Sequence, residues 1–263
     1  MDEIFALVSD RDAILEPSHI LSEEFAPSKN ANQGVAIYQG NAGVLWRRQA
    51  SSLAETELGK QIRGNALVAQ ASRPSAYDVA PSLANTAPFL RELQGQLWSF
   101  VSAGRIPGAL KRQDLIGHFP LGDSAAEHVF CRLLDCLREE LSEEGHILRQ
   151  DGVVQRFARK IEALELAETM NFLLSNGTDI IAYGNRPLYF RTALDGAVNT
   201  VTVTNRIPHR DDGWACIGSH TVCLLGITGA VAQHDVARSP KTTEPDPRDA
   251  WGLGEGDLDY NCG

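Results

Sequence analysis

The segment Gly122-Asp123-Ser124-Ala125-Ala126-Glu127 divides a strand-rich first half of the chain from a pair of amphipathic helices. Its Ser124-x-x-Glu127 pattern predicts a capping box, in which hydroxyl and carboxylate satisfy free backbone amides at a helix start. The apolar residues that follow recur at helical spacing and predict one buried face: Val129, Phe130, Leu133, Leu134, Leu137 and Leu141. A second helix is expected over about residues 153–167 by the same criterion.

Short strand-like runs lie on both sides of this helical region. The runs before it cover residues 4–8, 34–38, 43–46, 65–69 and 97–101. The runs after it cover residues 171–175, 178–183, 187–191, 200–204 and 221–225. Gly40-Asn41 and Asn176-Gly177 predict hairpin turns, the second with positive φ at both positions, and residues 72–90 are expected to be mostly loop. Strands, two helices and strands again predict an α+β fold of two sheets with helices packed outside.

Composition limits the kinds of partner. The 263 residues are 43% hydrophobic, enough for a full core, and carry a formal net charge of −10. That charge argues against nucleic acid, because phosphate binding needs clustered Lys and Arg. The first residues carry acids without a basic region, which argues against a secretory signal, and no apolar run approaches the ~20 residues of a membrane span. We therefore expect a cytoplasmic protein that binds neither nucleic acid nor membrane.

Cysteines and histidines give no strong sign of a metal or redox site. The five cysteines include no CxxC pair, and Cys131 and Cys136 are not spaced to share a helix face, so buried free thiols are expected. His209 and His220 can be combined with neighbouring acids into a metal or acid–base site on paper. A polar loop between strands explains them better, so we predict no metal and no cofactor.

The composition changes near the end of the chain. We predict one domain over residues 1–231 and a flexible acidic tail, rich in Pro and Gly, over residues 232–263. Trp251, Leu258 and Tyr260 are unusual for a tail that serves solubility alone. Two interpretations stay open: an inert terminus, or a short segment that orders when it docks on a partner.

Three further segments fall in an order that suggests a family. The chain opens Met1-Asp2-Glu3-Ile4-Phe5, continues with Ala31-Asn32-Gln33-Gly34-Val35-Ala36-Ile37-Tyr38, and then contains Asn85-Thr86-Ala87-Pro88-Phe89. This order resembles the glutaminase domain of class II glutamine amidotransferases over about residues 1–226. That family opens Met-Cys before its first strand, has Asp-Gly-Trp-Gly before a strand ending in Tyr, and then Asn-Thr-His-Pro-Phe.

At the positions that hold the family's catalytic residues, this chain has residues that lack the required functional groups. Asp2 stands where the N-terminal cysteine nucleophile belongs. Ala103 replaces the asparagine whose amide stabilises the oxyanion, and Gly104 keeps only a backbone donor. A carboxylate nucleophile at Asp2 is the less favoured alternative to a solvated acid, because this mechanism also needs a free α-amine as base.

The residues that hold glutamine in the family are replaced as well. Its Ala-His-x-Arg strand end becomes Ala69-Gln70-Ala71-Ser72, and a serine cannot grip a carboxylate as an arginine fork does. Arg73 is adjacent, but a shift of one residue at a strand end points a side chain elsewhere. The aspartate that recognises the substrate's amino group becomes Ala125.

The resemblance implies a four-layer αββα sandwich of the N-terminal-nucleophile hydrolase type with a dismantled glutaminase site. The leading hypothesis is a catalytically inactive scaffold or regulatory subunit of a biosynthetic, amide-forming or amide-modifying enzyme complex, bound to a protein partner or to itself. The alternatives are an enzyme that uses the remodelled pocket on another substrate, and a small-molecule sensor. The polar or altered residues of that pocket are Gln70, Ser72, Arg73, Ser102, Arg105 and Ala125. The candidate partner-binding residues are Trp251, Leu258 and Tyr260.

Overall fold

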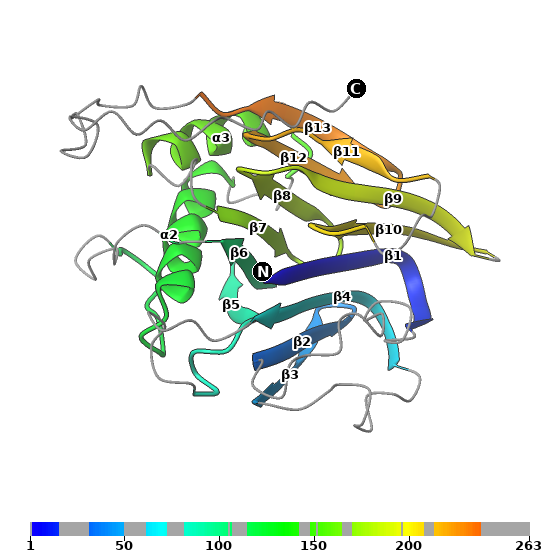
Figure 1. The fold of residues 1–263 in the computed structure, drawn as a ribbon, viewed down its shortest axis with the longest axis horizontal. Coiled ribbons are helices and arrows are strands. Elements are labelled where there is room, and N and C mark those ends of the chain that lie inside the picture. The colour runs from blue at the N-terminus through cyan, green and yellow to red at the C-terminus, as the bar shows by residue number, and fades with distance from the viewer. Residues whose placement is uncertain are drawn as a thin grey trace, which may run out of the picture.

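The computed structural model describes two antiparallel sheets that pack face to face, with helices on the outside of one of them (Figure 1). It describes residues 2–15, 32–49, 62–72, 82–104, 106, 115–141, 148–150, 152–164, 170–195, 197–207 and 213–237. Arg73, Arg105, His209, Trp251, Leu258 and Tyr260 lie outside these residues.

Sheet A has seven strands and contains the N-terminal strand near its centre. In order across the sheet they are β11 (Ala215–Ile217), β9 (Leu188–Asp195), β10 (Val198–Thr204), β1 (Glu3–Leu15), β4 (Ile62–Ser72), β2 (Asn32–Gln39) and β3 (Ala42–Gln49). The register of β1 is fixed on both sides, since Phe5 pairs with Ala69 of β4 and with Thr204 of β10.

Sheet B has six strands, arranged as three antiparallel hairpins side by side. In order they are β13 (Gly229–Asp235), β12 (Thr221–Gly226), β8 (Ile180–Gly184), β7 (Met170–Ser175), β6 (Gln96–Gly104) and β5 (Phe89–Leu93). Helices α2 (Ala125–Glu140) and α3 (Val153–Ala163) pack on its outer face. Phe100 of β6 stacks on Phe130 of α2 with 5.4 Å between ring centroids, which fixes the helix layer to the sheet.

The helix faces expected from apolar spacing are confirmed. All six residues of the predicted α2 face are buried, and α3 buries Val154, Phe157 and Ile161. The capping box is wrong, because Ser124 makes no side-chain cap bond although the helix starts directly after it. Glu127 turns inward instead and accepts a hydrogen bond from the backbone N–H of Gly122.

Each face of sheet A carries its own apolar cluster. The side chains that face sheet B form the main core with the inner face of that sheet and the helices, and they include Ile4, Ala6, Val8, Ala36, Tyr38, Ala66 and Val68. The opposite face carries a second cluster of side chains that are 1–7% exposed: Phe5, Val35, Ile37, Leu67 and Ala69. The described residues therefore contain three of the four predicted layers, namely sheet A, sheet B and one helix layer.

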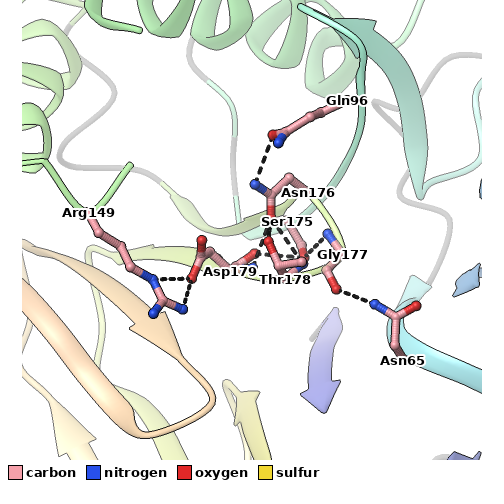
Figure 2. Close-up of polar contacts among 8 residues, drawn as sticks. All are labelled: Asn65, Gln96, Arg149, Ser175, Asn176, Gly177, Thr178 and Asp179. Carbon is pink, nitrogen blue, oxygen red and sulfur yellow. Dashed lines mark hydrogen bonds and ion pairs between the residues drawn. The ribbon is translucent and has the colours of Figure 1, made fainter. Parts of the chain in front are cut away.

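The turn between β7 and β8 is organised by one asparagine side chain (Figure 2). Asn176 Oδ1 accepts hydrogen bonds from Thr178 N at 3.1 Å, Thr178 Oγ1 at 3.0 Å and Asp179 N at 2.8 Å. The expected hairpin around Asn176-Gly177 is confirmed, but of these two residues only Gly177 has a positive φ, of +87°. The side chain of Asn176 does the work of a backbone turn, which is the behaviour of an Asx turn.

This turn also joins the two sheets. Asn65 of β4 donates from Nδ2 to the carbonyl of Gly177 at 2.8 Å, as Figure 2 shows. Tyr38 of β2 donates from its hydroxyl to the carbonyl of Ser175 at 3.2 Å. Arg149 binds one carboxylate oxygen of Asp179 through Nε at 3.1 Å and Nη2 at 2.7 Å. We name this group the turn network.

Several elements differ from the expectation. Strand β5 lies partly in the stretch expected to be loop, and strands β11 and β13 were not expected. Strand β13 continues past residue 231, where the domain was expected to end, and Val236 after it is buried. Among the described cysteines Cys131, Cys136 and Cys223 are buried and unpaired, whereas Cys216 is exposed, so the expectation of a buried thiol fails there. Neither α2 nor α3, the helices within the described ranges, is long and apolar enough to cross a membrane.

Candidate functional site

The candidate site begins where strand β1 enters sheet A. Asn205, just after β10, accepts a hydrogen bond from the backbone N–H of Ile4 at 3.0 Å and donates to the carbonyl of Asp2 at 2.9 Å. One carboxamide thus continues the strand ladder past its last backbone pair and fixes the backbone of Asp2. The adjacent Glu3 carboxylate pairs with Arg206 Nη1 at 2.6 Å. The first residues are therefore firmly positioned, although Asp2 offers a carboxylate in place of a thiol.

The end of β4 brings a second candidate residue to the same place. Gln70 pairs with Ile4 across the β1–β4 ladder. Its side-chain oxygen accepts a hydrogen bond from the backbone N–H of Ser102, on β6 of the other sheet, at 3.0 Å. The structure therefore brings Gln70 and Ser102 together across the interface between the sheets, close to the start of β1.

The end of β6 contains the segment that resembles the family's oxyanion segment. Ala103 is 6% exposed, and its methyl group can donate no hydrogen bond. Gly104 ends the strand opposite Met170 of β7 with φ of +114°, a conformation that suits glycine. The segment keeps the backbone geometry of a glycine-terminated strand but presents no side-chain donor at position 103.

Ser72 is the last residue of β4 and pairs with Asn32 of β2. A hydroxyl there can exchange one or two hydrogen bonds, but it carries no charge that would hold a carboxylate. Arg73 and Arg105, the two candidate cations of the pocket, lie outside the described residues.

A buried ion pair supports the start of α2, where Ala125 is the first helical residue. Glu127 is 1% exposed and pairs through one oxygen with Arg91 of β5, while its other oxygen accepts the N–H of Gly122 at 2.8 Å. The next residue, Asp123, donates its backbone N–H to Asn85 Oδ1 at 2.8 Å. The Asn85 side chain thus holds residues 85–89 against the segment that contains Ala125.

Arg47 extends this cluster to the edge of sheet A. Its guanidinium donates to the carbonyls of Leu83 at 2.9 Å and Pro88 at 2.8 Å and lies over the ring of Phe89. Burial lowers the pKa of Arg47, while the charge of Glu127 opposes that shift. The segment also presses on β2, because a Cβ at Gly34 would lie 2.0 Å from the carbonyl oxygen of Ala87. The preserved Gly34 is therefore explained by close backbone packing.

A second buried acid fixes the segment that precedes α2. Asp135 is 1% exposed and accepts backbone N–H groups from Ile116 at 2.8 Å and Gly117 at 3.1 Å, and its Oδ1 lies 3.0 Å from His118 Nδ1. Burial raises the pKa of Asp135, but the hydrogen bonds from Ile116, His118 and Gly117 outweigh it, so the net pKa is lowered.

No motif in the sequence indicates these supporting residues. Asn205, Arg91 and Asp135 act over long separations or from inside a helix, and no local pattern distinguishes them from surface polar residues. Within the described part of the chain, no three His, Cys, Asp or Glu residues gather as metal ligands. His220 lies in a turn at φ of +58° and donates its backbone N–H to Gly184. The described residues of the site offer backbone amides and small polar side chains as hydrogen-bonding groups.

The chain is similar to known proteins of one family. The sequence profile described as glutamine amidotransferases class-II matches residues 24–197, more than half of the chain. A relative from Haemophilus influenzae, named for glutamine amidotransferase, is 28% identical over 161 residues, which are 60% of this chain and 53% of the relative. YafJ of Escherichia coli, with a similar name, is 27% identical over 164 residues, 60% of this chain and 62% of that protein. The matched region thus spans little more than half of these curated relatives.

Solved structures share the fold. The crystal structure of a predicted glutamine amidotransferase from Pseudomonas aeruginosa superposes with a TM-score of 0.58 at 17% identity, over 88% of this chain and 99% of the other. A glutamine aminotransferase class-II domain protein from Silicibacter pomeroyi gives 0.56 at 17% identity, over 90% of this chain and 100% of the other. These structures have the amidotransferase fold of the N-terminal-nucleophile type. The chain therefore belongs to the class II glutamine amidotransferase family.

Proposed function

We propose that this chain is a non-catalytic member of its family that serves as a scaffold or regulatory subunit of a biosynthetic, amide-forming or amide-modifying enzyme in the cytoplasm. The observation that carries the proposal is that the residues that position the site are in place, whereas the family's catalytic residues are replaced. The backbone of Asp2 is clamped by Asn205, and the segment before α2 is fixed by Glu127. The family's nucleophile and oxyanion donor are meanwhile replaced by Asp2 and Ala103.

A surface feature supports a protein partner. Eight large apolar side chains are exposed among the described residues. Six of them come from β3, the segment around residue 83 and the segment before α2. We name these six the apolar edge: Val44, Trp46, Leu83, Ile116, Phe119 and Leu121. Arg47 binds the carbonyl of Leu83 and Arg91 binds that of Phe119, so these segments are anchored to one cluster. Val44 and Trp46 lie opposite Ile37 and Val35, on the face of sheet A turned away from sheet B, so these side chains are spread over adjoining segments. Large apolar side chains exposed in this number are candidates for an interaction surface.

The first test combines an activity assay with native mass spectrometry. The purified chain is expected to release no ammonia from glutamine above the rate of a heat-denatured sample. Protein isolated from its own host at low salt is expected to carry a stoichiometric second polypeptide. Glutamine hydrolysis at the rate of an active family member would refute the proposal, and so would a monomer in every preparation.

A surface variant then tests the apolar edge. Phe119→Ser is expected to weaken the partner's binding about 30-fold, because a central apolar anchor contributes about 2 kcal/mol. The matched control is Leu194→Ser on β9, which removes a side chain of similar exposure from another part of the surface. Equal binding by both variants would show that the partner docks elsewhere.

A second candidate function follows from the polar groups at the remodelled site. Gln70 and Ser72, near the end of β4, are partly exposed. Ser102 on β6 donates its backbone N–H to Gln70. We propose as the alternative that this site binds a small molecule other than glutamine, as a repurposed enzyme or as a sensor. A metabolite that stabilises the chain thermally, and fails to stabilise Ser72→Val, would favour this alternative over the subunit.

The complete four-layer αββα arrangement is part of the same proposal. The outward side chains Phe5, Val35 and Leu67 of sheet A are as buried as core residues. Since a sheet face is buried only when something packs on it, this burial supports a fourth layer. Hydrogen exchange should find the amides of β2 and β4 protected to the same degree as those of β7 and β8.

A further inference from the structure

The side chain of Gln70 lies between the two sheets at the candidate site. Along β4 the even-numbered residues Ala66 and Val68 belong to the core between the sheets, so Gln70 faces sheet B. The hydrogen bond from Ser102 N to Gln70 Oε1 at 3.0 Å confirms that direction. Because β5 pairs with β6 only as far as Phe100, the bond is made at the edge of β6 that β5 leaves uncovered.

Ala103 faces the same space from the opposite sheet. Burial raises the pKa of Tyr38, a core residue of sheet A, and a hydrogen bond with Ser99 of β6 opposes that shift, so Ser99 faces sheet A. Alternation along a strand then points Ala103 toward sheet A as well. Ser102 and Ala103 are each 6% exposed, whereas Gln70 is partly exposed. Gln70 therefore stands at the surface in front of two buried residues.

The chemistry of the contact matches the substrate class of the family. A glutaminase site receives a carboxamide whose oxygen meets donors of the oxyanion segment. Here a carboxamide oxygen of the protein itself meets a backbone donor of the corresponding segment. The Gln70 side chain is already attached to the protein, so it loses no translational and rotational entropy of association when it binds. A free small molecule must lose that entropy, which favours Gln70.

We propose that Gln70 acts as a built-in plug, which closes the space in front of Ala103 to small carboxamides. This inference rests on the proposed function only in its assignment of the site. It adds that the site is closed to small carboxamides, besides lacking the family's catalytic residues. Reinstalling the lost nucleophile and oxyanion donor would then be insufficient for activity while Gln70 is present.

Thiol labelling tests the plug directly. In a Cys216→Ser background, Ala103→Cys places a thiol behind Gln70, and iodoacetamide serves as a reactive carboxamide probe. We expect Cys labelling at position 103 to be about five- to tenfold faster when Gln70→Ala is added, the effect of losing one net hydrogen bond on a local opening equilibrium. Peptide mass spectrometry measures the rate at this position alone.

Two controls separate the plug from loss of structure. Cys131 of α2 is fully buried and must stay unlabelled in every variant, which reports an intact fold. Gln70→Glu keeps the length and the acceptor oxygen, so it is expected to label as slowly as the parent. Equal rates with Gln70 and Gln70→Ala, or fast labelling of Gln70→Glu, would overturn the proposal. The readout does not depend on a partner or on glutaminase activity, so the two proposals fail independently.

Discussion

The two ends of the sandwich are held together in different ways. At the turn end, Asn65 and Tyr38 both donate from sheet A to carbonyls of the β7–β8 turn, and Asn176 satisfies the turn internally. At the site end, Gln70 and Ser102 share one hydrogen bond between the sheets, and Arg47 of β3 lies over the ring of Phe89 on β5. The turn end is a structural joint, whereas the site end is a place where residues have been exchanged without loss of the fold.

This difference explains why chemistry can be lost while architecture remains. A buried polar network is costly to break in part, because each removed partner leaves another group unsatisfied. Positions such as Ala103 and Ala125 take part in no such network, so their replacement leaves nothing unpaired. Substitutions at the two ends should therefore differ in their effect on stability.

The largest effect is expected from Asn176→Ala at the turn end. The change leaves two backbone N–H groups, of Thr178 and Asp179, without their acceptor and removes the bond to Gln96. We expect the free energy of unfolding to fall by about 3 kcal/mol, measured by urea denaturation. Asn199→Ala, at an exposed asparagine bonded to Asp10, is the control and should cost less than about 1 kcal/mol. Equal losses would remove the distinction between a joint and a surface contact.

The next effect concerns the buried carboxylate of Asp135 and depends on pH. Its pKa in the folded chain is lowered below the ordinary 3.8, so its contribution to stability is fully present above about pH 4 and is lost as pH falls through that lowered pKa. Asp135→Asn should destabilise the protein by about 2 kcal/mol at pH 7 and by much less near pH 3. Asp123→Asn, at an exposed position, is the comparison. A deficit that stays constant between these pH values would contradict the ionic role.

A smaller effect compares the two cross-sheet amides directly. Asn65→Ala removes a bond to Gly177 O and leaves the N–H of Gly40 without its acceptor, both at 2.8 Å. We expect a loss of about 1–2 kcal/mol, against about 1 kcal/mol or less for Gln70→Ala. Parallel denaturation curves measure both. A greater loss at Gln70 would mean that the site end is the stronger joint.

The smallest effect is expected from Ala125→Asp at the start of α2. The position is the first helical residue, where a carboxylate interacts favourably with the helix dipole. The free energy of unfolding should change by no more than about 0.5 kcal/mol, in the stabilising direction at low salt. Thermal denaturation with and without 1 M salt would detect it, since Debye screening is about 3 Å at that concentration. A loss above about 1 kcal/mol would show that the site end has repacked around alanine.

Local patterns in the sequence predict much of this fold. The apolar face of α2, the hairpin around Gly40-Asn41 and most strands follow from periodicity and turn residues, which are properties of neighbouring positions. Strand β5 was missed, because Phe89 follows a stretch rich in Pro, Ser and Asn that masks its start. Glu127 matched a local cap motif, but tertiary contacts with Arg91 and Gly122 determine its orientation.

The candidate site was less predictable, for a physical reason. The resemblance to the family assigns roles to Asp2, Ala103 and Ala125 one position at a time. It carries no information on which replaced residues meet, and the contact between Gln70 and Ser102 crosses two sheets. The clamp of Asn205 on Asp2 joins residues 203 positions apart, a distance over which no spacing rule applies.

Strand β1 has a consequence for how the chain is made. It lies between β4 and β10, so β1 leaves the ribosome well before β10 and lacks this neighbour until residue 204 has been synthesised. At a usual elongation rate this takes about 10 to 40 s. Throughout that time an apolar strand has an open edge, exposed to chaperones and to other nascent chains. The residues of β1 thus leave the ribosome long before they can reach their final position.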